Sequence, residues 1–373
     1  MSDLDLQVKQ SLKRVSHQFS DAALKNAQLN DQEKTAFKTK LESTPIRMRI
    51  ELTNECNLRC TFCYKSYFNN KDKLQMSLDV FKKLDPYMKR AKFLTFFTKS
   101  EPLIAENLKP ALEMTADYGA VRYFSTNGIP LTREKSEWLV DNRLTFLQVS
   151  VNSFTPKEYA KVYRGGQLEV LENNLKTLND VKKERKSIFP KVRISMCGTK
   201  ESIVNIEDGI RFAKKYQLEE GVQITPFYEL GEEHDGQTYE DSPEFFRSYY
   251  ERGKRLANEL GVPFWIISDA TNPDGELKYC YDPWESMSIE PNGEVFPCVV
   301  SNQSMGNVNK QSLDEIWNGP KIQEFRSKVN ITTDDQNEEC KNCLNCHVHK
   351  LKTATNTARP LKTFAGGYYR VKN

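Results

Sequence analysis

The sequence lacks the features that would place the protein in a membrane, outside the cell or on nucleic acid. No apolar run among its 373 residues approaches the ~20 residues that a transmembrane helix needs. The N-terminal stretch Met-Ser-Asp-Leu-Asp-Leu-Gln-Val-Lys has no signal-peptide core. The net charge of +3 and the pI near 8.2 are too mild to indicate a nucleic-acid or anionic-membrane partner. We therefore expect neither partner.

A disulfide framework is also not expected, although the chain contains 9 cysteines. Without a secretion signal the cysteines should be reduced, and thiolates that bind iron need a reducing compartment, so we expect a cytoplasmic protein. Hydrophobic residues make up 38% and charged residues 28% of the chain, as in soluble globular proteins. A chain of 373 residues is long enough for one barrel with an appendage.

The cysteines form three groups, and one cysteine stands alone. The first group follows an apolar run with the spacing C-x3-C-x2-C, and the other two groups lie near the C-terminus. For the single cysteine we favour burial by packing, because free cysteine behaves as a small hydrophobic residue. The groups are Cys56, Cys60 and Cys63; Cys280 and Cys298; and Cys340, Cys343 and Cys346; the single residue is Cys197.

The first cysteine group has the spacing of an iron–sulfur site. Three close thiolates can hold three irons of a [4Fe–4S] cube and leave the fourth iron open to bind and reduce a ligand. The alternative is a structural zinc site, which usually repeats a C-x2-C knuckle and needs a fourth ligand nearby. No Cys or His lies between Cys63 and Cys197, so the spacing favours iron.

Strand-like and helical segments alternate from Ile46 onward, which predicts parallel β/α units. Right-handed crossovers can close such a sheet into a partial (β/α)6 barrel of the TIM type, an α/β fold. Ligands of these sheets bind at the carboxyl ends of the strands, where the first cysteine group lies. The expected strands are 47–53, 92–97, 120–126, 145–152, 192–197 and 222–228, and the expected helices are 77–90, 106–118, 132–142, 167–182, 203–216 and 243–260.

On these residues the chain resembles the radical S-adenosylmethionine (SAM) superfamily. Phe62 matches the aromatic position that the family usually has before its third cysteine. The resemblance implies a [4Fe–4S] cluster on Cys56, Cys60 and Cys63 whose open iron binds SAM. Reductive cleavage of SAM would give a 5′-deoxyadenosyl radical that takes hydrogen from an unactivated C–H bond. The electron would come from a flavodoxin- or ferredoxin-type donor.

The resemblance also implies residues that bind SAM. The family usually has Gly-Gly-Glu-Pro after the second strand, and here Lys99 and Ser100 replace the glycines before the acidic residue. In the fourth strand Asn152 replaces the usual Asp, and a downstream Arg would clamp the cofactor's carboxylate. The expected SAM-binding residues are Phe62, Glu101, Ser125, Asn127, Ser150, Asn152 and Arg164.

Each of these assignments has a plain structural alternative. Glu101 would otherwise be a loop charge, Ser125–Gly128 a turn and Arg164 a solvated surface residue. Met196–Gly198 and Thr225–Tyr228 are expected to line the pocket, with buried packing as the equal alternative.

The C-terminal cysteines point to a second cluster. Asn292-Gly293 between two apolar runs predicts a hairpin, and Ser312–Glu315 is a capping box that opens a helix through Phe325. The region resembles the SPASM/Twitch extension of the superfamily. Five thiols cannot fully ligate two cubes, so we predict one auxiliary [4Fe–4S] cluster, and zinc is the alternative. Its ligands would be Cys280, Cys298, Cys340 and Cys343, with Cys346 as a spare or as a replacement for Cys343, and His347 and His349 as conceivable ligands.

The predicted organisation has four parts: a helical N-terminal extension (1–45), the radical SAM partial barrel (46–268), the SPASM/Twitch domain (269–350) and a basic tail (351–373). The extension has a thin apolar stripe at Leu6, Val8, Leu12 and Val15, and a second helix is expected at 31–42. It would serve as a lid or as a packing extension, with a leader-peptide-binding module as the alternative.

Three functions remain open at this point. The 17-residue spacing between Cys280 and Cys298 resembles that of aminocyclitol-oxidising Twitch dehydrogenases, which favours oxidation of a sugar- or aminocyclitol-like small molecule. Val299 stands where the sulfatase-maturing branch has Asp. The alternatives are a maturase that cross-links or epimerises a ribosomal peptide and a non-catalytic zinc or iron–sulfur scaffold. The sequence does not choose a base among Tyr228, Glu229, His234 and Asp282.

Overall fold

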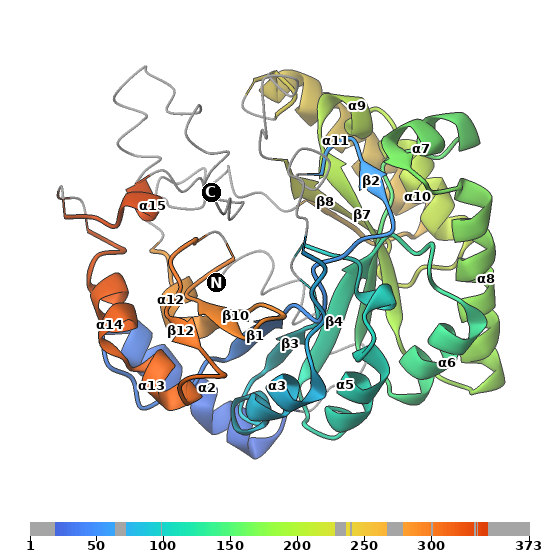
Figure 1. Ribbon diagram of the computed structural model, residues 1–373. Helices are drawn as coiled ribbons and strands as arrows, with labels where there is room; N and C mark the ends of the chain where they lie inside the picture. Colours follow the sequence, from blue (N-terminus) through green and yellow to red (C-terminus); the bar gives the residue numbers. More distant parts are fainter. Residues whose placement is uncertain are drawn as a thin grey trace.

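The computed structural model describes residues 19–63, 72–97, 99–227, 236–238, 241–266, 279–299, 301–331, 333 and 335–341. In this part of the chain a 10-stranded sheet forms the centre, in the order β12-β11-β10-β1-β3-β4-β5-β7-β8-β9 (Figure 1). The strands are β1 (Arg47–Ile50), β3 (Phe93–Thr95), β4 (Val121–Thr126), β5 (Phe146–Ser150), β7 (Lys191–Gly198), β8 (Val222–Pro226), β9 (Phe264–Ile266), β10 (Ser286–Ile289), β11 (Glu294–Phe296) and β12 (Gly306–Asn307).

The helices connect the parallel strands and cover the outer side of the curved sheet (Figure 1). The expected partial α/β barrel is therefore confirmed, and every strand and helix expected within the barrel has a counterpart, although one helix is divided and the ends differ by a few residues. The helices are α3 (Leu78–Lys83), α4 (Asp85–Met88), α5 (Leu108–Met114), α6 (Arg133–Asp141), α7 (Pro156–Val162), α8 (Leu168–Glu184), α9 (Lys200–Ile203), α10 (Ile206–Lys215) and α11 (Pro243–Leu260), and a 3-10 turn, η2, covers Pro102–Ile104.

Two details of the barrel differ from expectation. The helix expected at 77–90 is divided at Leu84, which ends α3 and begins α4, and a proline stands in the first turn of α4, where its missing N–H costs nothing. In addition, β9 follows α11 and pairs in parallel with β8, so the barrel has one more strand than the sequence predicted.

The two faces of the sheet have different chemistry because side chains alternate along a strand. On the outer face Ile50, Leu94, Phe124 and Ile194 are at most 1% exposed and belong to the main hydrophobic core with the helices. The alternate residues carry polar groups and face the interior of the barrel. The following pairs of these residues lie opposite each other on neighbouring strands: Arg49 and Thr95, Thr95 and Tyr123, Ser125 and Gln148, Gln148 and Arg193, and Ser195 and Gln223.

An aromatic cluster closes the amino-terminal end of this interior. It forms a hydrophobic core of its own, and the segment before the first described helix contributes to it. The opposite end, at the carboxyl ends of the strands, carries the cysteine loop. The residues of the cluster are Val121, Phe146 and Phe189, with Phe19, Phe93 and Tyr123 packed against them.

The N-terminal extension contains a helix, α2 (Asp21–Thr35), in place of the helix expected at 31–42. Its buried face is polar, which is why an apolar pattern could not locate it. Asn30 donates to the carbonyl of Trp284 over 2.7 Å, and Glu33 accepts the N–H groups of residues 42 and 43. This helix is thus a packing element; the predicted stripe of Leu6, Val8, Leu12 and Val15 lies outside the described residues.

The C-terminal region extends the barrel sheet. The expected hairpin at Asn292-Gly293 is confirmed as β10 and β11, and β10 also pairs in parallel with β1, which the sequence did not predict. The Ser312–Glu315 capping box is confirmed. The single helix expected through Phe325 is two helices: the first ends at Asn318, and Gly319-Pro320 begins the second. The region contains α12 (Asp282–Glu285), α13 (Leu313–Trp317), α14 (Pro320–Ser327) and α15 (Glu338–Lys341).

Among the described residues no helix is both long enough and apolar enough to cross a membrane.

Candidate iron–sulfur and cofactor site

The loop that carries the first cysteine group is fixed by a small antiparallel ribbon. Strand β2 (Arg59–Cys60) pairs with β6 (Tyr163–Arg164), so that Cys60 lies opposite Tyr163. The N–H of Thr61 donates to the carbonyl of Val162 over 3.0 Å. These bonds tie the loop after β1 to the segment after β5, at the carboxyl end of the sheet where the topology predicted the site.

The thiols of this loop lie close enough to interact with one another. Burial raises the pKa of the Cys60 thiol, and the neighbouring Cys63, Cys56 and Cys197 thiols raise it further. Three thiolates at such positions repel one another, and a positively charged iron centre would remove that repulsion.

The donor set fits an iron–sulfur cube better than a single ion. A cube takes one thiolate on each of three irons and leaves the fourth iron open, which matches three thiols carried by one loop. A structural zinc site would need a fourth ligand on the same ion. Cys56, Cys60 and Cys63 are thus the residues that would hold the cluster.

Phe62 belongs to an aromatic wall beside this loop. Its ring packs edge-on against Tyr163 at 5.6 Å, and Tyr163 stacks on Tyr159 at 4.6 Å. Both tyrosine rings are at most 1% exposed. The wall holds Phe62 next to the cluster loop, and its predicted role toward SAM stays a prediction.

Glu101 joins the loop after β3 to the end of β4. Its carboxylate accepts hydrogen bonds from Thr126 Oγ1 at 2.6 Å, Asn127 N at 2.7 Å and Leu103 N at 3.0 Å. Burial raises the pKa of this carboxyl to about 7, although the three hydrogen bonds act to lower it. One oxygen accepts a single bond, so the group keeps an acceptor position for the predicted contact with the SAM ammonium.

Asn127 connects this carboxylate to the cluster loop. Its amide nitrogen donates to Asn57 Oδ1 at 2.9 Å and lies 3.9 Å from Cys56 Sγ. A hydrogen bond to a cluster thiolate is one of the factors that set the potential of an iron–sulfur centre. The structure thus places Asn127 beside a cluster ligand, whereas the sequence had placed it only at the SAM site.

Glu51 is a functional candidate that the sequence did not reveal. It lies directly after β1, is 4% exposed, and accepts from the N–H of Lys99 at 3.0 Å and from the hydroxyl of Ser100. These two residues replace the usual glycines, so a buried carboxylate holds the loop at this position. The sequence signal for this residue was a Glu that directly follows an apolar strand and precedes the cysteine motif by a few positions.

The serines and Asn152 lie at the ends of β4 and β5, as predicted. Ser125 Oγ accepts from Gln148 Nε2 at 2.8 Å, and Ser150 lies in register with Ser195. The Oδ1 atom of Asn152 accepts the N–H of Cys197 at 2.8 Å. The Asn152 side chain thus lies against Cys197, and its predicted contact with the ribose stays a prediction.

Arg164 is exposed on β6, and its role toward the SAM carboxylate stays a prediction. Its partner across the ribbon, Arg59, has a closer connection to the cluster loop. Arg59 Nη1 donates to the carbonyls of Cys56 and Leu58, both at 2.9 Å. The structure thus adds a guanidinium that fixes the backbone at the first cysteine.

Cys197 lies near the cluster cysteines although 134 positions separate it from Cys63 in the sequence. Burial raises the pKa of its thiol to about 11; Asn152 acts in the opposite direction, and Cys63 raises it further. Its position at the end of β7, beside the strand that leads to Asn152, explains the proximity. The residue is only half-buried, so the expected packing role stays a prediction, and its location adds a fourth thiol to this end of the barrel.

Amide and carboxylate side chains hold the segments that carry the C-terminal cysteines Cys280, Cys298 and Cys340. Asn330 holds Cys280 through two 2.9 Å bonds, one to its N–H and one to its carbonyl. The N–H of Ser301 donates to Cys298 Sγ at 3.3 Å, and Glu339 accepts from the N–H of Asn302 at 2.8 Å. The loop after Cys298 is thereby joined to the helix that bears Cys340. Cys343, Cys346, His347 and His349 lie outside the described residues.

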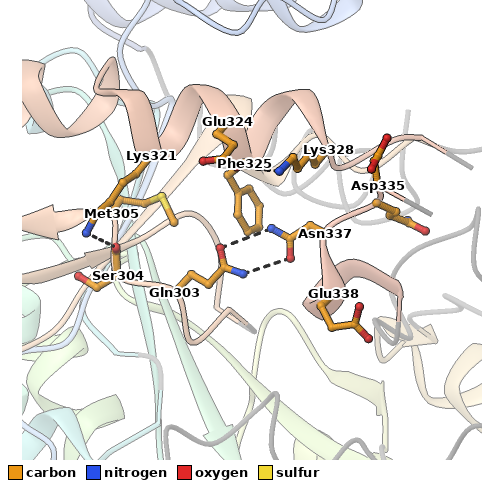
Figure 2. Close-up of a pocket in the computed structure, with 11 residues that line it drawn as sticks. Gln303, Ser304, Met305, Lys321, Glu324, Phe325, Lys328, Asp335, Asn337 and Glu338 are labelled. Carbon is orange, nitrogen blue, oxygen red and sulfur yellow. Dashed lines mark hydrogen bonds and ion pairs between the residues drawn. The ribbon is translucent and has the colours of Figure 1, made fainter. Parts of the chain in front are cut away.

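A hollow of about 610 Å³ lies beside this assembly (Figure 2). Phe325 points into it, and the amides of Gln303 and Asn337 face each other at 3.4 Å. Its charged residues carry both signs, and Glu324 is paired with Lys328 at 2.6 Å. Its two lysines and three carboxylates nearly balance, and no unpaired buried group in its lining selects a ligand, so we assign it none.

Asp282 is the one base candidate in the described part of the chain, and its surroundings argue against that role. It forms an ion pair with Arg49 at 3.3 Å and accepts from Ser286 Oγ at 3.1 Å. Burial would raise the pKa of its carboxyl, but Arg49 and Arg47 lower it further than burial raises it. A carboxylate that two guanidiniums hold ionised is a weak base. Tyr228, Glu229 and His234 lie outside the described residues.

A partial barrel with three thiols in the loop after its first strand, joined to a second thiol-bearing hairpin and helix, defines a protein suited to hold iron–sulfur clusters. The family comparisons agree. The radical SAM superfamily model matches residues 50–213, and SPASM, an iron-sulfur cluster-binding domain, matches residues 280–347. The protein belongs to the radical SAM superfamily and carries a C-terminal SPASM domain, so its cofactors are SAM and [4Fe–4S] clusters.

Individual relatives are distant. A probable GTP 3′,8-cyclase of Methanocaldococcus jannaschii is 26% identical over 52% of this chain and 63% of its own length, and the next curated relative is also matched over less than two thirds of its length. The SAM-dependent 2-deoxy-scyllo-inosamine dehydrogenase of Niallia circulans is 21% identical over 81% of this chain and 93% of its own.

Solved structures show the same fold. Streptococcus suis SuiB bound to SAM has a TM-score of 0.64 at 17% identity, covering 93% of this chain and 82% of that one. The same protein bound to its precursor peptide SuiA has a TM-score of 0.61 at 17% identity, covering 88% of this chain and 74% of that one.

Proposed function

We propose that this radical SAM enzyme oxidises a sugar- or aminocyclitol-like small molecule by removing hydrogen from an unactivated C–H bond. The observation that carries the proposal is the proximity of the second cysteine group to the barrel interior. Cys298 follows β11, which joins the barrel sheet through β10 and β1, and β1 leads to the loop of Cys56. A substrate at this end of the barrel would thus be within reach of the SAM-binding thiols and of the auxiliary thiols, as an oxidation that must export an electron requires.

When bound, SAM and the two clusters supply hydrogen-atom removal and electron transfer. The chain's own residues have the other tasks. Cys56, Cys60 and Cys63 would hold the first cluster. The side-chain amide of Asn127 would donate to the Sγ atom of Cys56, which lies 3.9 Å away. The aromatic cluster around Phe146 closes the barrel from below and excludes water. Inner-face polar groups would hold the substrate against the cofactor.

The choice of a small molecule rests on three observations. The Niallia circulans dehydrogenase aligns along most of this chain, the spacing of Cys280 and Cys298 resembles that class, and α2 packs into the fold instead of standing apart as a peptide-binding module. The similarity to SuiB bound to its precursor peptide supports a peptide maturase as the second candidate.

Anaerobic reconstitution with iron, sulfide and dithionite tests the cluster assignment. We expect about eight irons per chain, because two cubes carry four each, and release of 5′-deoxyadenosine from SAM. Cys60→Ala should abolish that release and reduce iron to about four per chain. Cys197→Ala is the matched control and should keep the wild-type iron content. Iron near four in the wild type, or a protein that holds iron but never cleaves SAM, would contradict the proposal.

The substrate class needs a separate experiment. Reduced enzyme and SAM would be incubated with a panel of aminocyclitols and sugars and, in parallel, with candidate precursor peptides. We expect a product two mass units lighter from a small molecule, reflecting loss of two hydrogens, and faster release of 5′-deoxyadenosine. Modification of a peptide alone would overturn the first candidate in favour of the second. Replacing dithionite with a flavodoxin or ferredoxin system tests the proposed electron donor.

A further inference from the structure

The inner face of the barrel has a polar layer between the aromatic cluster below and the cysteine loop above. Gln148, Arg193 and Gln223 occupy neighbouring positions on β5, β7 and β8, and Tyr123 and Arg49 occupy the same face of β4 and β1. Because all point to the side that the helices do not cover, this layer faces the space where a substrate would bind.

Hydrogen bonds within the layer fix the orientation of Arg193. Its Nε donates to Gln148 Oε1 at 3.0 Å, and Gln223 Nε2 also donates to that oxygen, at 3.3 Å. Gln148 Nε2 is bound to Ser125 Oγ at 2.8 Å, so the Gln148 amide is held in one orientation. Within the described part of the chain, the Arg193 side chain donates through Nε alone. The two terminal nitrogens are therefore available as a planar fork.

Further polar atoms of the layer are buried and have no hydrogen-bond partner within the described residues. On the inner face they are Arg49 Nη1, Gln223 Oε1 and the hydroxyls of Thr95 and Ser288, which lie in register with Arg49. Buried polar groups are normally satisfied, and an unsatisfied one in a native structure calls for a ligand, water or ion. Arg49 Nη1 can only donate and both hydroxyls can donate, so a ligand with acceptor atoms would satisfy three of these four atoms.

The charges of the layer also favour an anion. Burial lowers the pKa of the Arg193 guanidinium, and Tyr123 and Glu220 offset only part of that effect. Burial acts on Arg49 as well, but Asp282 more than compensates and raises its pKa. Asp282 thus neutralises one of the arginines, while Glu220 is the only carboxylate that acts on Arg193 among the described residues. A half-buried cation with so little compensation gains from a bound oxyanion.

The position of Arg193 suits a substrate better than SAM. It precedes Cys197 by four residues on β7, which corresponds to about 13 Å along a strand. SAM would bind at the cysteine loop, at the end of the strand. An anionic group held at Arg193 would lie deeper and would direct the remainder of its molecule upward toward the cofactor.

We propose that the substrate carries a phosphate or carboxylate group and that Arg193 binds it through its two terminal nitrogens, with Arg49 as the second donor. A guanidinium fork matches the paired oxygens of either group. The inference rests on the proposed function and adds the chemical class of the substrate.

Binding to reconstituted, SAM-loaded but unreduced enzyme tests this assignment without turnover. Anaerobic calorimetry would use inorganic phosphate, glucose 6-phosphate, gluconate and, as the neutral counterpart, glucose. We expect at least one anion to bind and glucose not to bind, and the preferred anion distinguishes phosphate from carboxylate. Arg193→Gln should weaken anion binding at least tenfold, whereas Arg211→Gln, an exposed arginine on α10, should leave it unchanged.

Three results would overturn the proposal: no anion binds the wild type, glucose binds as well as glucose 6-phosphate, or Arg193→Gln binds anions like the wild type. If the substitution instead weakens SAM binding and the anions displace SAM, Arg193 serves the cofactor and the proposal is wrong. The comparison of charged and neutral probes on the wild type needs no variant. Normal SAM cleavage without anion binding would refute this inference alone, and anion binding without SAM cleavage would refute the proposed function alone.

Discussion

Buried carboxylates organise the rim of the barrel at the level of single residues. Glu51 holds the Lys99-Ser100 turn, and Glu101 holds the end of β4. Both lie between strands that are adjacent in the sheet, and both accept backbone N–H groups that would otherwise be unsatisfied. The loops that surround the SAM site therefore depend on two ionisable groups that do not themselves bind iron.

The free energy of unfolding of the wild type should depend on pH through the Glu101 carboxyl, and this dependence should be absent from the Glu101→Gln variant. Burial raises the pKa of this carboxyl from 4.5 to about 7, so the folded state binds the proton more tightly than the unfolded state. The resulting stabilisation is present below pH 4.5 and is lost as the pH rises toward 7. The free energy of unfolding of the wild type, relative to Glu101→Gln, should fall by about 3 kcal/mol across that range.

Urea unfolding of iron-free protein at a series of pH values measures this difference. Glu106→Gln, an exposed neighbour on the same loop, should show no comparable trend against the wild type. If the difference between the wild type and Glu101→Gln is constant between pH 4.5 and 7, Glu101 titrates as an ordinary carboxyl.

At the level of elements, the turn after β4 shows how closely the barrel and its helices are packed. Gly128 has φ +74°, and a Cβ at this position would lie 2.4 Å from Leu171 Cδ1 on α8. The turn needs glycine both for its left-handed backbone and for the approach of the helix. The same turn carries Asn127, so its shape affects the cluster loop.

A comparison of Gly128→Ala with Gly261→Ala should separate the cost of the left-handed backbone from the cost of the close approach of α8. Gly261 ends α11 with φ +64°, and a Cβ there would have no atom within 4 Å, so its substitution reports backbone strain alone, about 1–2 kcal/mol. Gly128→Ala should cost about 1–3 kcal/mol more in the free energy of unfolding, because Leu171 must move. Equal costs in urea unfolding would show that α8 accommodates the methyl group freely.

At the level of the whole molecule, the barrel, the SPASM region and the N-terminal extension form one connected structure. Strand β10 continues the barrel sheet through β1. Arg326 of α14 is 2% exposed and donates to the carbonyls of Pro283, Thr39 and Trp317 at 2.8 to 3.0 Å. One guanidinium thus joins the segment before the barrel to two helices after it.

Arg326→Gln should destabilise the protein by about 3 kcal/mol or more, because buried carbonyls lose their donors. The loss should appear as one shifted transition in thermal unfolding followed by both far-UV circular dichroism and tryptophan fluorescence. Arg255→Gln on the exposed side of α11 should change stability by less than about 0.5 kcal/mol. Separate transitions by the two probes in the wild type would show that the regions unfold independently.

The sequence alone determined the order of strands and helices, the cysteine loop after β1, the hairpin at Asn292-Gly293 and the capping box at Ser312. Each of these is a local pattern, because periodicity, turn residues and ligand spacing act within a few positions of the chain. It also predicted that Glu101, Asn127 and Asn152 lie at strand ends, since parallel strands bring their carboxyl ends together.

The tertiary structure alone decided the pairing of β10 with β1, the approach of Cys197 to the cluster loop, the polar burial of α2 and the arginine layer of the inner face. These contacts join segments tens to hundreds of residues apart, and they depend on which strand lies beside which and on the direction of each side chain after the sheet has curved. Hydrophobic periodicity can locate an apolar face, but it carries no signal for a face that is buried through hydrogen bonds or charge.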